Sequence, residues 1–235
     1  MKRFFRRLAL RPTLLVAFTM LWSLIALPAQ AAVTITFWSH ELGNSFPHAF
    51  ITLRGVPDAG GDPIDSSFGF TAKSVSPALL FGPVAGKVER PTIGYMNGSD
   101  AQFSVTLTDA QYAAELALLA AWDPERGGDG QYSLNQRNCV HFVKEAARIA
   151  GLSGLDQPSL MKKPRSYLKT VAAANSAAIT IVAQHGKDYL ATLPPVAGPT
   201  VAGRDAPDLH VLPPAAPGQP IGTISTTSSV ASNPG

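Results

Sequence analysis

The two ends of this chain lack the composition of a packed core, so they limit the foldable part to residues 32–193. Residues 194–235 hold nine prolines among Ala, Gly, Ser and Thr, without hydrophobic periodicity. Such a segment buries too little apolar surface to offset the entropy of ordering it. We therefore predict a disordered tail over residues 194–235, preceded by one domain of ordinary size.

The first 31 residues have the pattern of an export signal. Five basic residues precede an apolar run over residues 14–27, and Ala29-Gln30-Ala31 follows as an A-x-A cleavage site. The alternative, an uncleaved membrane anchor, is disfavoured because the run is shorter than the roughly 20 residues that span a bilayer. We expect cleavage after Ala31, a periplasmic or secreted protein, and no integral membrane segment after cleavage.

The basic charge of the chain belongs mostly to this signal. The whole chain has 19 basic and 16 acidic residues, and removal of residues 1–31 leaves 14 basic against the same 16 acidic. With this ratio of basic to acidic residues, the domain that remains after cleavage has no evident basic face for nucleic acid. One cluster of basic residues lies outside the signal segment, at Lys162, Lys163, Arg165 and Lys169. We interpret it as the solvated start of a helix rather than as a patch that binds phosphate or a membrane surface.

Within residues 32–193, strand patterns come first and helix patterns follow. Strands are predicted at residues 33–38, 49–53, 66–71, 86–89 and 102–107, the first two forming a hairpin. Thr108 and Gln111 form a capping box that starts a helix ending near Trp122. A second helix is expected from Cys139 to residue 150, capped by Asn138 and stopped by Gly151. This order predicts an α+β fold, with a small antiparallel sheet packed against the cysteine-bearing helix and additional helices.

Cys139 is the only cysteine, so it is either an inert buried side chain or a nucleophile. The first turn of a helix offers free amides and the positive end of the macrodipole, which favour a thiolate. A metal site formed with His141 is disfavoured, because residues two apart on a helix cannot aim at one ion and no further ligand cluster exists. We expect no metal and no cofactor.

A thiol nucleophile needs a base, and two of the five histidines are candidates. His48 directly precedes a predicted strand, which holds its backbone, whereas His40 lies in a loop beside Glu41. We favour His48. His141 lies about 200° around the helix from Cys139, too far to share its face.

Two sequence motifs resemble a known family. They are Pro47-His48-Ala-Phe-Ile-Thr-Leu and Asn138-Cys139-Val-His141-Phe142-Val143. Together they resemble the circularly permuted NlpC-like branch of the papain-fold superfamily, especially the lecithin retinol acyltransferase-like group with its N-C-x-H-F motif. In that branch the histidine strand precedes the cysteine helix and meets it across a small antiparallel sheet. The resemblance covers roughly residues 33–152.

The resemblance implies a thiol hydrolase, either an amidase or peptidase or an acyl hydrolase, or an acyltransferase. Cys139 would attack a carbonyl to form a thioester, and His48 would carry the protons. The amide of Cys139, at the helix cap formed by Asn138, would be an oxyanion donor. His141 matches the motif histidine that is not the base, with a role in packing or hydrogen bonding.

One family feature is missing from the sequence. The family places a third polar group, often a second histidine, on the strand after the first, and residues 49–75 contain no histidine. Ser67 and Thr71 share a strand face, and Asp65 is a charged alternative. The departure leaves a second hypothesis open, a catalytically silent papain-like module that only binds its ligand.

The expected ligand is a peptide, peptidoglycan stems included, or an acyl lipid. We expect a monomer whose substrate cleft is walled by aromatic and loop residues. These are Trp38, His40, Phe46 and Tyr132.

Overall fold

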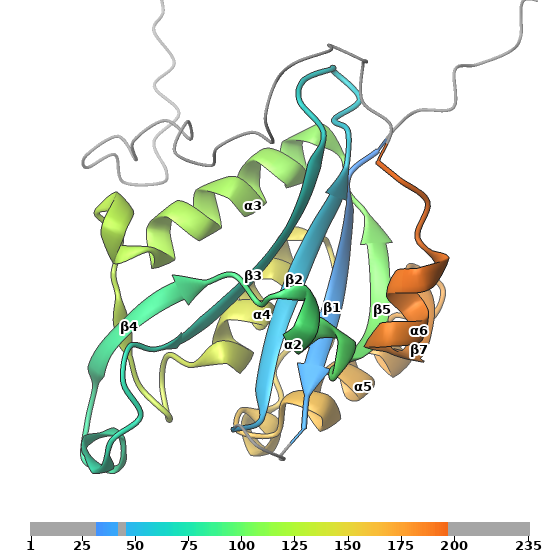
Figure 1. Cartoon of the computed structure of the whole chain (residues 1–235). Coiled ribbons are helices and arrows are strands. Elements are labelled where there is room, and N and C mark those ends of the chain that lie inside the picture. Colours follow the sequence, from blue (N-terminus) through green and yellow to red (C-terminus); the bar gives the residue numbers. More distant parts are fainter. Residues whose placement is uncertain (1–31, 42–45, 197–235) are drawn as a thin grey trace, which may run out of the picture.

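The computed structural model describes residues 32–41 and 46–196 of the chain (Figure 1). The predicted signal segment, and the predicted tail beyond residue 196, lie outside these residues and stay predictions. In the described part of the chain no helix is long and apolar enough to cross a membrane.

A seven-stranded antiparallel sheet runs through the molecule, with the strand order β6-β4-β3-β2-β1-β5-β7. Its strands are β1 (Thr34–His40), β2 (His48–Gly55), β3 (Ile64–Ala72), β4 (Val84–Glu89), β5 (Asp100–Thr106), β6 (Gln131–Tyr132) and β7 (Thr180–His185). Helices pack on both faces, so the predicted α+β class is confirmed.

The α-helices of the described residues cover the two faces of the sheet unequally (Figure 1). They are α2 (Ile93–Asn97), α3 (Asp109–Trp122), α4 (Cys139–Ile149), α5 (Pro164–Ala174) and α6 (Gly186–Thr192). Three of them, α3, α4 and α5, share one face, and α2 and α6 lie on the other. Short 3-10 turns join these elements: η2 (Pro77–Leu80), η3 (Pro124–Arg126) and η4 (Pro158–Leu160).

Alternation along the central strands divides the core in two. Phe37 and Ile51 point toward α4 and α5 and join the larger cluster, which includes Phe142 of α4. Trp38 and Phe50, each next to one of these residues on its strand, belong to a smaller cluster on the α2 side. Residues next to each other on one strand therefore serve opposite faces of the sheet.

Several local predictions agree with these elements. The first two strands pair antiparallel, with His40 opposite His48. Thr108 and Gln111 form the capping box of α3, Asn138 caps α4, and Gly151 follows α4 with a φ of +82° that suits a glycine stop.

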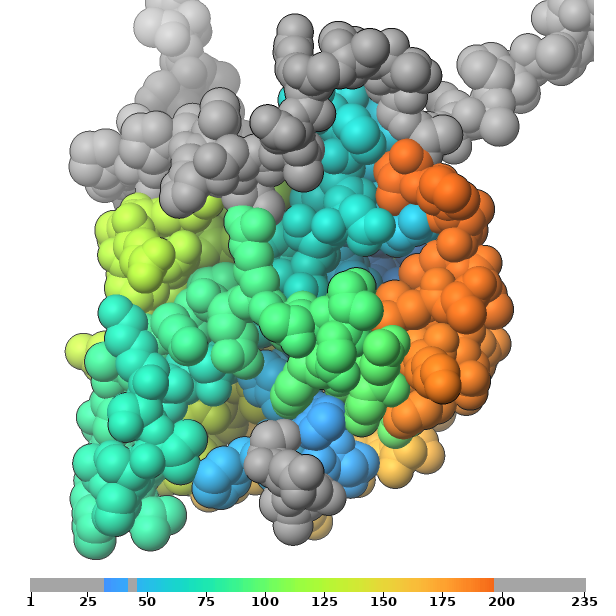
Figure 2. Space-filling view, viewed as in Figure 1, coloured from blue at the N-terminus to red at the C-terminus, as the bar shows by residue number. Residues whose placement is uncertain are grey.

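The β3 strand changes neighbours along its length. Its pairing with β2 ends at Phe50 opposite Gly69, and its pairing with β4 begins at Gly69 opposite Glu89. Beyond this point β3 and β4 run on to a connection at the lower left of the molecule, which projects from its body (Figures 1 and 2). The end of β2 that carries His48 is thus without a β3 partner.

Candidate active site

The N-terminus of α4 is held in place by one side chain, that of Asn138. Its Oδ1 accepts hydrogen bonds from the backbone N–H groups of Val140 (2.8 Å) and His141 (3.1 Å). Its Nδ2 donates to the carbonyl oxygens of Leu134 and Met161, each at 2.8 Å. A single buried amide therefore fixes the first turn of the helix to the two segments around it.

His141 completes this cap. Its Nδ1 accepts a hydrogen bond from the Asn138 backbone N–H at 3.3 Å, which makes Asn138 and His141 a reciprocal capping box. The histidine of the N-C-x-H-F motif is therefore engaged with the helix end. Its ring faces a different hollow from the one that holds Cys139.

Cys139 and His48 approach each other from the two faces of the sheet. His48 lies on the α2 side with Phe50, at a ring separation of 6.1 Å, whereas Cys139 belongs to the core under α4. They meet where the β2–β3 pairing has ended, and the thiol and the imidazole interact strongly enough to shift each other's pKa. The Ala49 N–H, which has no β3 partner in this register, also contributes to lowering the pKa of the thiol.

A third polar group, Glu89, stands behind the imidazole. Its Oε1 lies 3.2 Å from His48 Nε2, in an ion pair rather than a well-aligned hydrogen bond. With Nε2 directed at Glu89, Nδ1 is the nitrogen left for the thiol. The three side chains thus form a Cys139–His48–Glu89 series in which each group contacts the next.

Gly69 provides the space that this series needs. A Cβ atom at residue 69 would lie 2.6 Å from His48 Nε2, closer than real Cβ contacts come. The imidazole therefore rests directly on the backbone of β3. Any side chain at this position would push the ring away from Glu89.

The electrostatics of the three groups support one another. Burial opposes ionisation of Cys139, but hydrogen bonds from His48 and from the amides of Ala49 and Val140 hold the pKa of its thiol below the ordinary value. Burial likewise opposes the charged form of His48, yet the Cys139 and Glu89 contacts raise its pKa to about 9. The His48 contact lowers the pKa of Glu89. The arrangement favours a thiolate–imidazolium pair near neutral pH.

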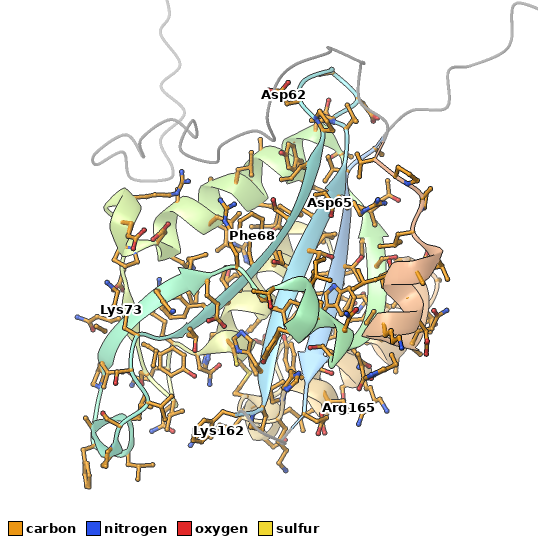
Figure 3. All side chains as sticks on the ribbon, viewed as in Figure 1. Asp62, Asp65, Phe68, Lys73, Lys162 and Arg165 are labelled. Atoms are coloured by element: carbon orange, nitrogen blue, oxygen red, sulfur yellow. The ribbon has the colours of Figure 1, made fainter. Side chains whose placement is uncertain are left out.

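Glu89 was missed because sequence reasoning looked for the third group on the strand that follows β2. Two of the three candidates there are engaged elsewhere: Ser67 Oγ donates to the Pro91 carbonyl at 2.6 Å, and Asp65 pairs with Arg54. Asp65 lies at the end of the molecule opposite Lys162 (Figure 3). Thr71 lines the cavity that contains Cys139. The carboxylate comes instead from β4, one strand further.

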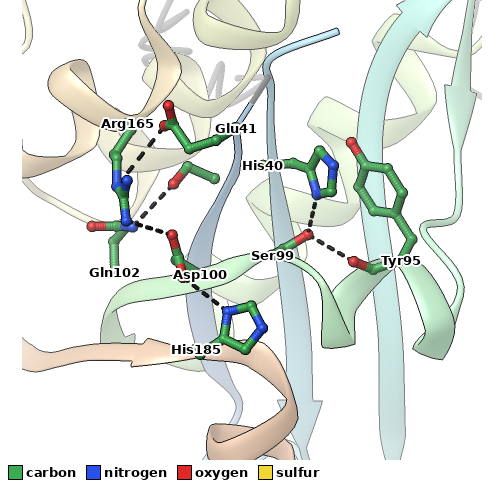
Figure 4. A network of polar contacts seen from close by, with 9 residues as sticks. His40, Glu41, Tyr95, Ser99, Asp100, Gln102, Arg165 and His185 are labelled. Carbon is green, nitrogen blue, oxygen red and sulfur yellow. Dashed lines mark hydrogen bonds and ion pairs between the residues drawn. The ribbon is translucent and has the colours of Figure 1, made fainter. Parts of the chain in front are cut away.

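His40, the alternative base, belongs to a different network (Figure 4). Its Nδ1 lies 3.0 Å from Ser99 Oγ, which itself donates to the Tyr95 carbonyl at 2.8 Å. Because the Ser99 proton is used in that bond, His40 Nδ1 is the donor to Ser99. Burial, assisted by the charge of His48, lowers the pKa of His40. Its ring stacks on Tyr95 at 4.3 Å.

A cavity of about 880 Å³ opens over Cys139, His48 and Glu89. Phe46 and Tyr132 line it, as expected for cleft residues. Trp38 and His40, also expected as cleft walls, are not among the residues that line this cavity. Alternation directs Trp38 into the smaller core, where it is fully buried against Phe50 and Tyr189. The walls also include apolar residues that sequence reasoning left unassigned: Ala72, Val75, Pro77, Leu79 and Leu80.

No cluster of His, Cys, Asp and Glu side chains suited to a metal ion occurs among the described residues. Comparison of the chain with protein-family models, curated proteins and solved structures finds no match. What the site can do has to be inferred from its own geometry.

Proposed function

We propose that this chain is a thiol-dependent hydrolase or acyl transferase, exported from the cytoplasm, that acts through a thioester on Cys139. The observation that carries the proposal is the contact series from the Cys139 thiol through the His48 imidazole to the Glu89 carboxylate, at the floor of an open cavity. A nucleophile, a base and a group that orients the base are the components of covalent acyl transfer.

The reaction follows from these positions. The Cys139 thiolate attacks the substrate carbonyl carbon, forming a C–S bond and an oxyanion. The imidazolium of His48 then gives its proton to the leaving amine or alcohol as the carbon–heteroatom bond breaks. Water, or an acceptor alcohol or amine, loses its proton to His48 and attacks the thioester carbon. The tetrahedral intermediate then breaks its C–S bond, which releases the acyl product and restores the Cys139 thiolate beside the His48 imidazolium.

Donors for the oxyanion lie at the same end of the cavity. The backbone N–H of Cys139 is in the first turn of α4, where helix amides lack intrahelical partners. Tyr132 lines the cavity, and burial followed by the charges of Cys139 and Glu89 raises the pKa of its hydroxyl. That hydroxyl stays protonated and available as a donor.

The resemblance to the permuted NlpC-like papain branch supports the same chemistry and remains part of the proposal. The histidine strand comes first and the cysteine helix later, in the order of that branch. Glu89 takes the third position, which family members often fill with a histidine. The alternative of a silent binding module predicts a thiol of ordinary reactivity.

Alkylation of Cys139 by iodoacetamide at pH 6 separates the two possibilities. For a thiol held as thiolate by His48 we expect a rate about tenfold or more above that of free cysteine. His48→Ala should remove this excess, while His40→Ala, a matched change of the histidine opposite it in the hairpin, should retain it. A wild-type rate no faster than free cysteine would overturn the proposal, and loss of the excess in His40→Ala alone would move the base to His40.

A further inference from the structure

The connection between β3 and β4 carries an unusual number of exposed apolar side chains. We define the β3–β4 tip as residues 73–83, which include the 3-10 turn Pro77–Leu80. Phe81 is 87% exposed, Leu80 76% and Val75 61%. Single exposed apolar residues are common on protein surfaces, but three on one short projecting connection are not explained by packing among the described residues.

This tip forms one wall of the cavity over Cys139. Val75, Leu79 and Leu80 line the cavity together with His48 and Cys139. Phe46, 67% exposed, contributes from the segment before β2. The exposed apolar surface is therefore continuous with the walls of the cavity that holds the nucleophile.

Basic side chains flank the same opening. Lys162 lines the cavity, Lys163 follows it, and Lys73 begins the tip; all three are exposed. None of them has an ion pair within the described residues, unlike Arg165, which pairs with Asp100 at 2.7 Å. Segments 73–88 and 158–165, which border the opening, contain no Asp or Glu. The nearest carboxylates in the sequence are Glu89, inside the cavity beside His48, and Asp156, which pairs with Lys144. Lys162 and the projecting tip both lie at the lower end of the molecule in Figure 3.

We propose that the β3–β4 tip, with Phe46, Lys162 and Lys163, forms a surface that binds an anionic lipid bilayer and sets the mouth of the Cys139 cavity against it. Aromatic and aliphatic side chains enter the boundary between headgroups and acyl chains, and lysines beside them reach the lipid phosphates. Three exposed lysines without an ion pair among the described residues fit a negatively charged surface. A narrow projection is also better suited to insertion between lipids than to the broad contact that a stable protein complex requires.

This surface goes beyond the proposed thiol chemistry and narrows its substrate. A cavity opened toward lipid, with apolar walls leading to Cys139, receives an acyl chain and brings an ester or amide carbonyl to the thiol. The assignment of an acyl-chain substrate rests on the proposed function, but binding to the bilayer does not. Binding is therefore tested with a variant that lacks the Cys139 nucleophile.

The test is co-sedimentation of residues 32–235 carrying Cys139→Ala with phosphatidylcholine vesicles, either alone or with roughly 30 mol% phosphatidylglycerol as the anionic lipid. All the packed elements described above lie within this chain. We expect binding to the anionic vesicles that weakens in salt. Leu80→Ser with Phe81→Ser should lower the partition coefficient about tenfold or more, and Lys162→Gln with Lys163→Gln should lower it by a similar factor on anionic vesicles only.

The matched controls are Ile181→Ser, at a residue 53% exposed on β7, and Lys187→Gln on α6, both at the opposite edge of the sheet. Both should bind as the parent does. Binding no greater than background, or equal losses in the controls, would overturn the proposal. So would a parent chain that self-associates or captures a protein through the tip residues without binding vesicles. Any of these results leaves the alkylation test of Cys139 intact, so the two proposals fail separately.

Discussion

At the scale of single residues, the site depends on which group stands behind the imidazole of His48. Glu89 contributes charge at 3.2 Å from Nε2, and the charge of a carboxylate near a buried histidine stabilises the imidazolium. The thiolate of Cys139 depends in turn on that imidazolium. A substitution of Glu89 should therefore change the pKa of the Cys139 thiol through His48, without a direct contact to the sulfur.

Glu89→Gln keeps the shape of the side chain and removes its charge. We expect the pKa of His48 to fall and that of Cys139 to rise, because the carboxylate that stabilises the imidazolium is gone. The rising limb of the Cys139 alkylation profile should therefore move to higher pH. Rates measured with iodoacetamide from pH 4 to 9 report the shift. Glu41→Gln, at a carboxylate 3.9 Å from Arg165, serves as the control and should leave the profile in place. An unchanged profile in Glu89→Gln would remove Glu89 from the site.

Residue identity alone located two members of the series but not the third. Cys139 and His48 stood out because a lone thiol began an amphipathic helix and a histidine began an alternating strand. Glu89 stood out in no local pattern, since its contact with His48 depends on β3 leaving β2 at Gly69 and pairing with β4. Only the strand register brings residue 89 beside residue 48.

At the scale of elements, the position of Cys139 depends on how α4 begins. Asn138 supplies two acceptor contacts to helix amides and two donor contacts to neighbouring loops, whereas His141 supplies the single return bond of the capping box. The two motif residues on either side of Cys139 thus both stabilise the start of the helix, and Asn138 makes more of the hydrogen bonds than His141 does.

This difference in hydrogen bonding predicts that the two side chains contribute unequally to stability. Asn138→Ala should lower the free energy of unfolding by about 2–3 kcal/mol, because two buried carbonyl groups lose their donor along with the cap. His141→Ala should lower it by about 0.5–1 kcal/mol and leave the alkylation rate of Cys139 within about twofold of wild type. Urea unfolding gives both values. If His141→Ala slowed alkylation as His48→Ala does, the histidine would belong to the chemistry.

Elements with a strong repeating pattern were the predictable ones. The β1 and β2 strands alternate because the side that faces α4 and α5 is mostly apolar, whereas the other side also carries polar residues such as Thr36 and Thr52. The α3 and α4 helices begin at recognisable caps. The β7 strand and α6 were not predicted. Five of the six β7 residues are exposed, so this edge strand carries no alternation, and its conformation follows from pairing with β5.

At the scale of the whole molecule, one buried acid has no evident part in the site. Glu115 of α3 is fully buried, and neither of its carboxylate oxygens has a hydrogen-bond partner among the described residues. Burial, opposed in part by the charge of Arg148, raises the pKa of Glu115 from 4.5 to about 9. The folded chain therefore holds a proton here that the unfolded chain releases above pH 4.5.

This difference sets the sign of a pH dependence. A carboxyl group with a raised pKa in the folded state makes the protein less stable as the pH rises, by up to about 1.4 kcal/mol per pH unit between its two pKa values. Glu115→Gln has no proton to release. Its stability relative to wild type should therefore be greater at pH 8 than at pH 5 by roughly 2–4 kcal/mol.

Comparing the two pH values isolates the titration of Glu115 from the other effects of the substitution. The buried amide that Glu115→Gln introduces carries its own desolvation cost, but that cost is the same at pH 5 and pH 8 and cancels in the difference. Urea unfolding of both proteins at both pH values supplies the free energies required. Glu125→Gln, at an exposed carboxylate in the turn after α3, should show no such difference. Equal stability offsets at the two pH values would mean that Glu115 is ionised in the folded protein and has a polar partner.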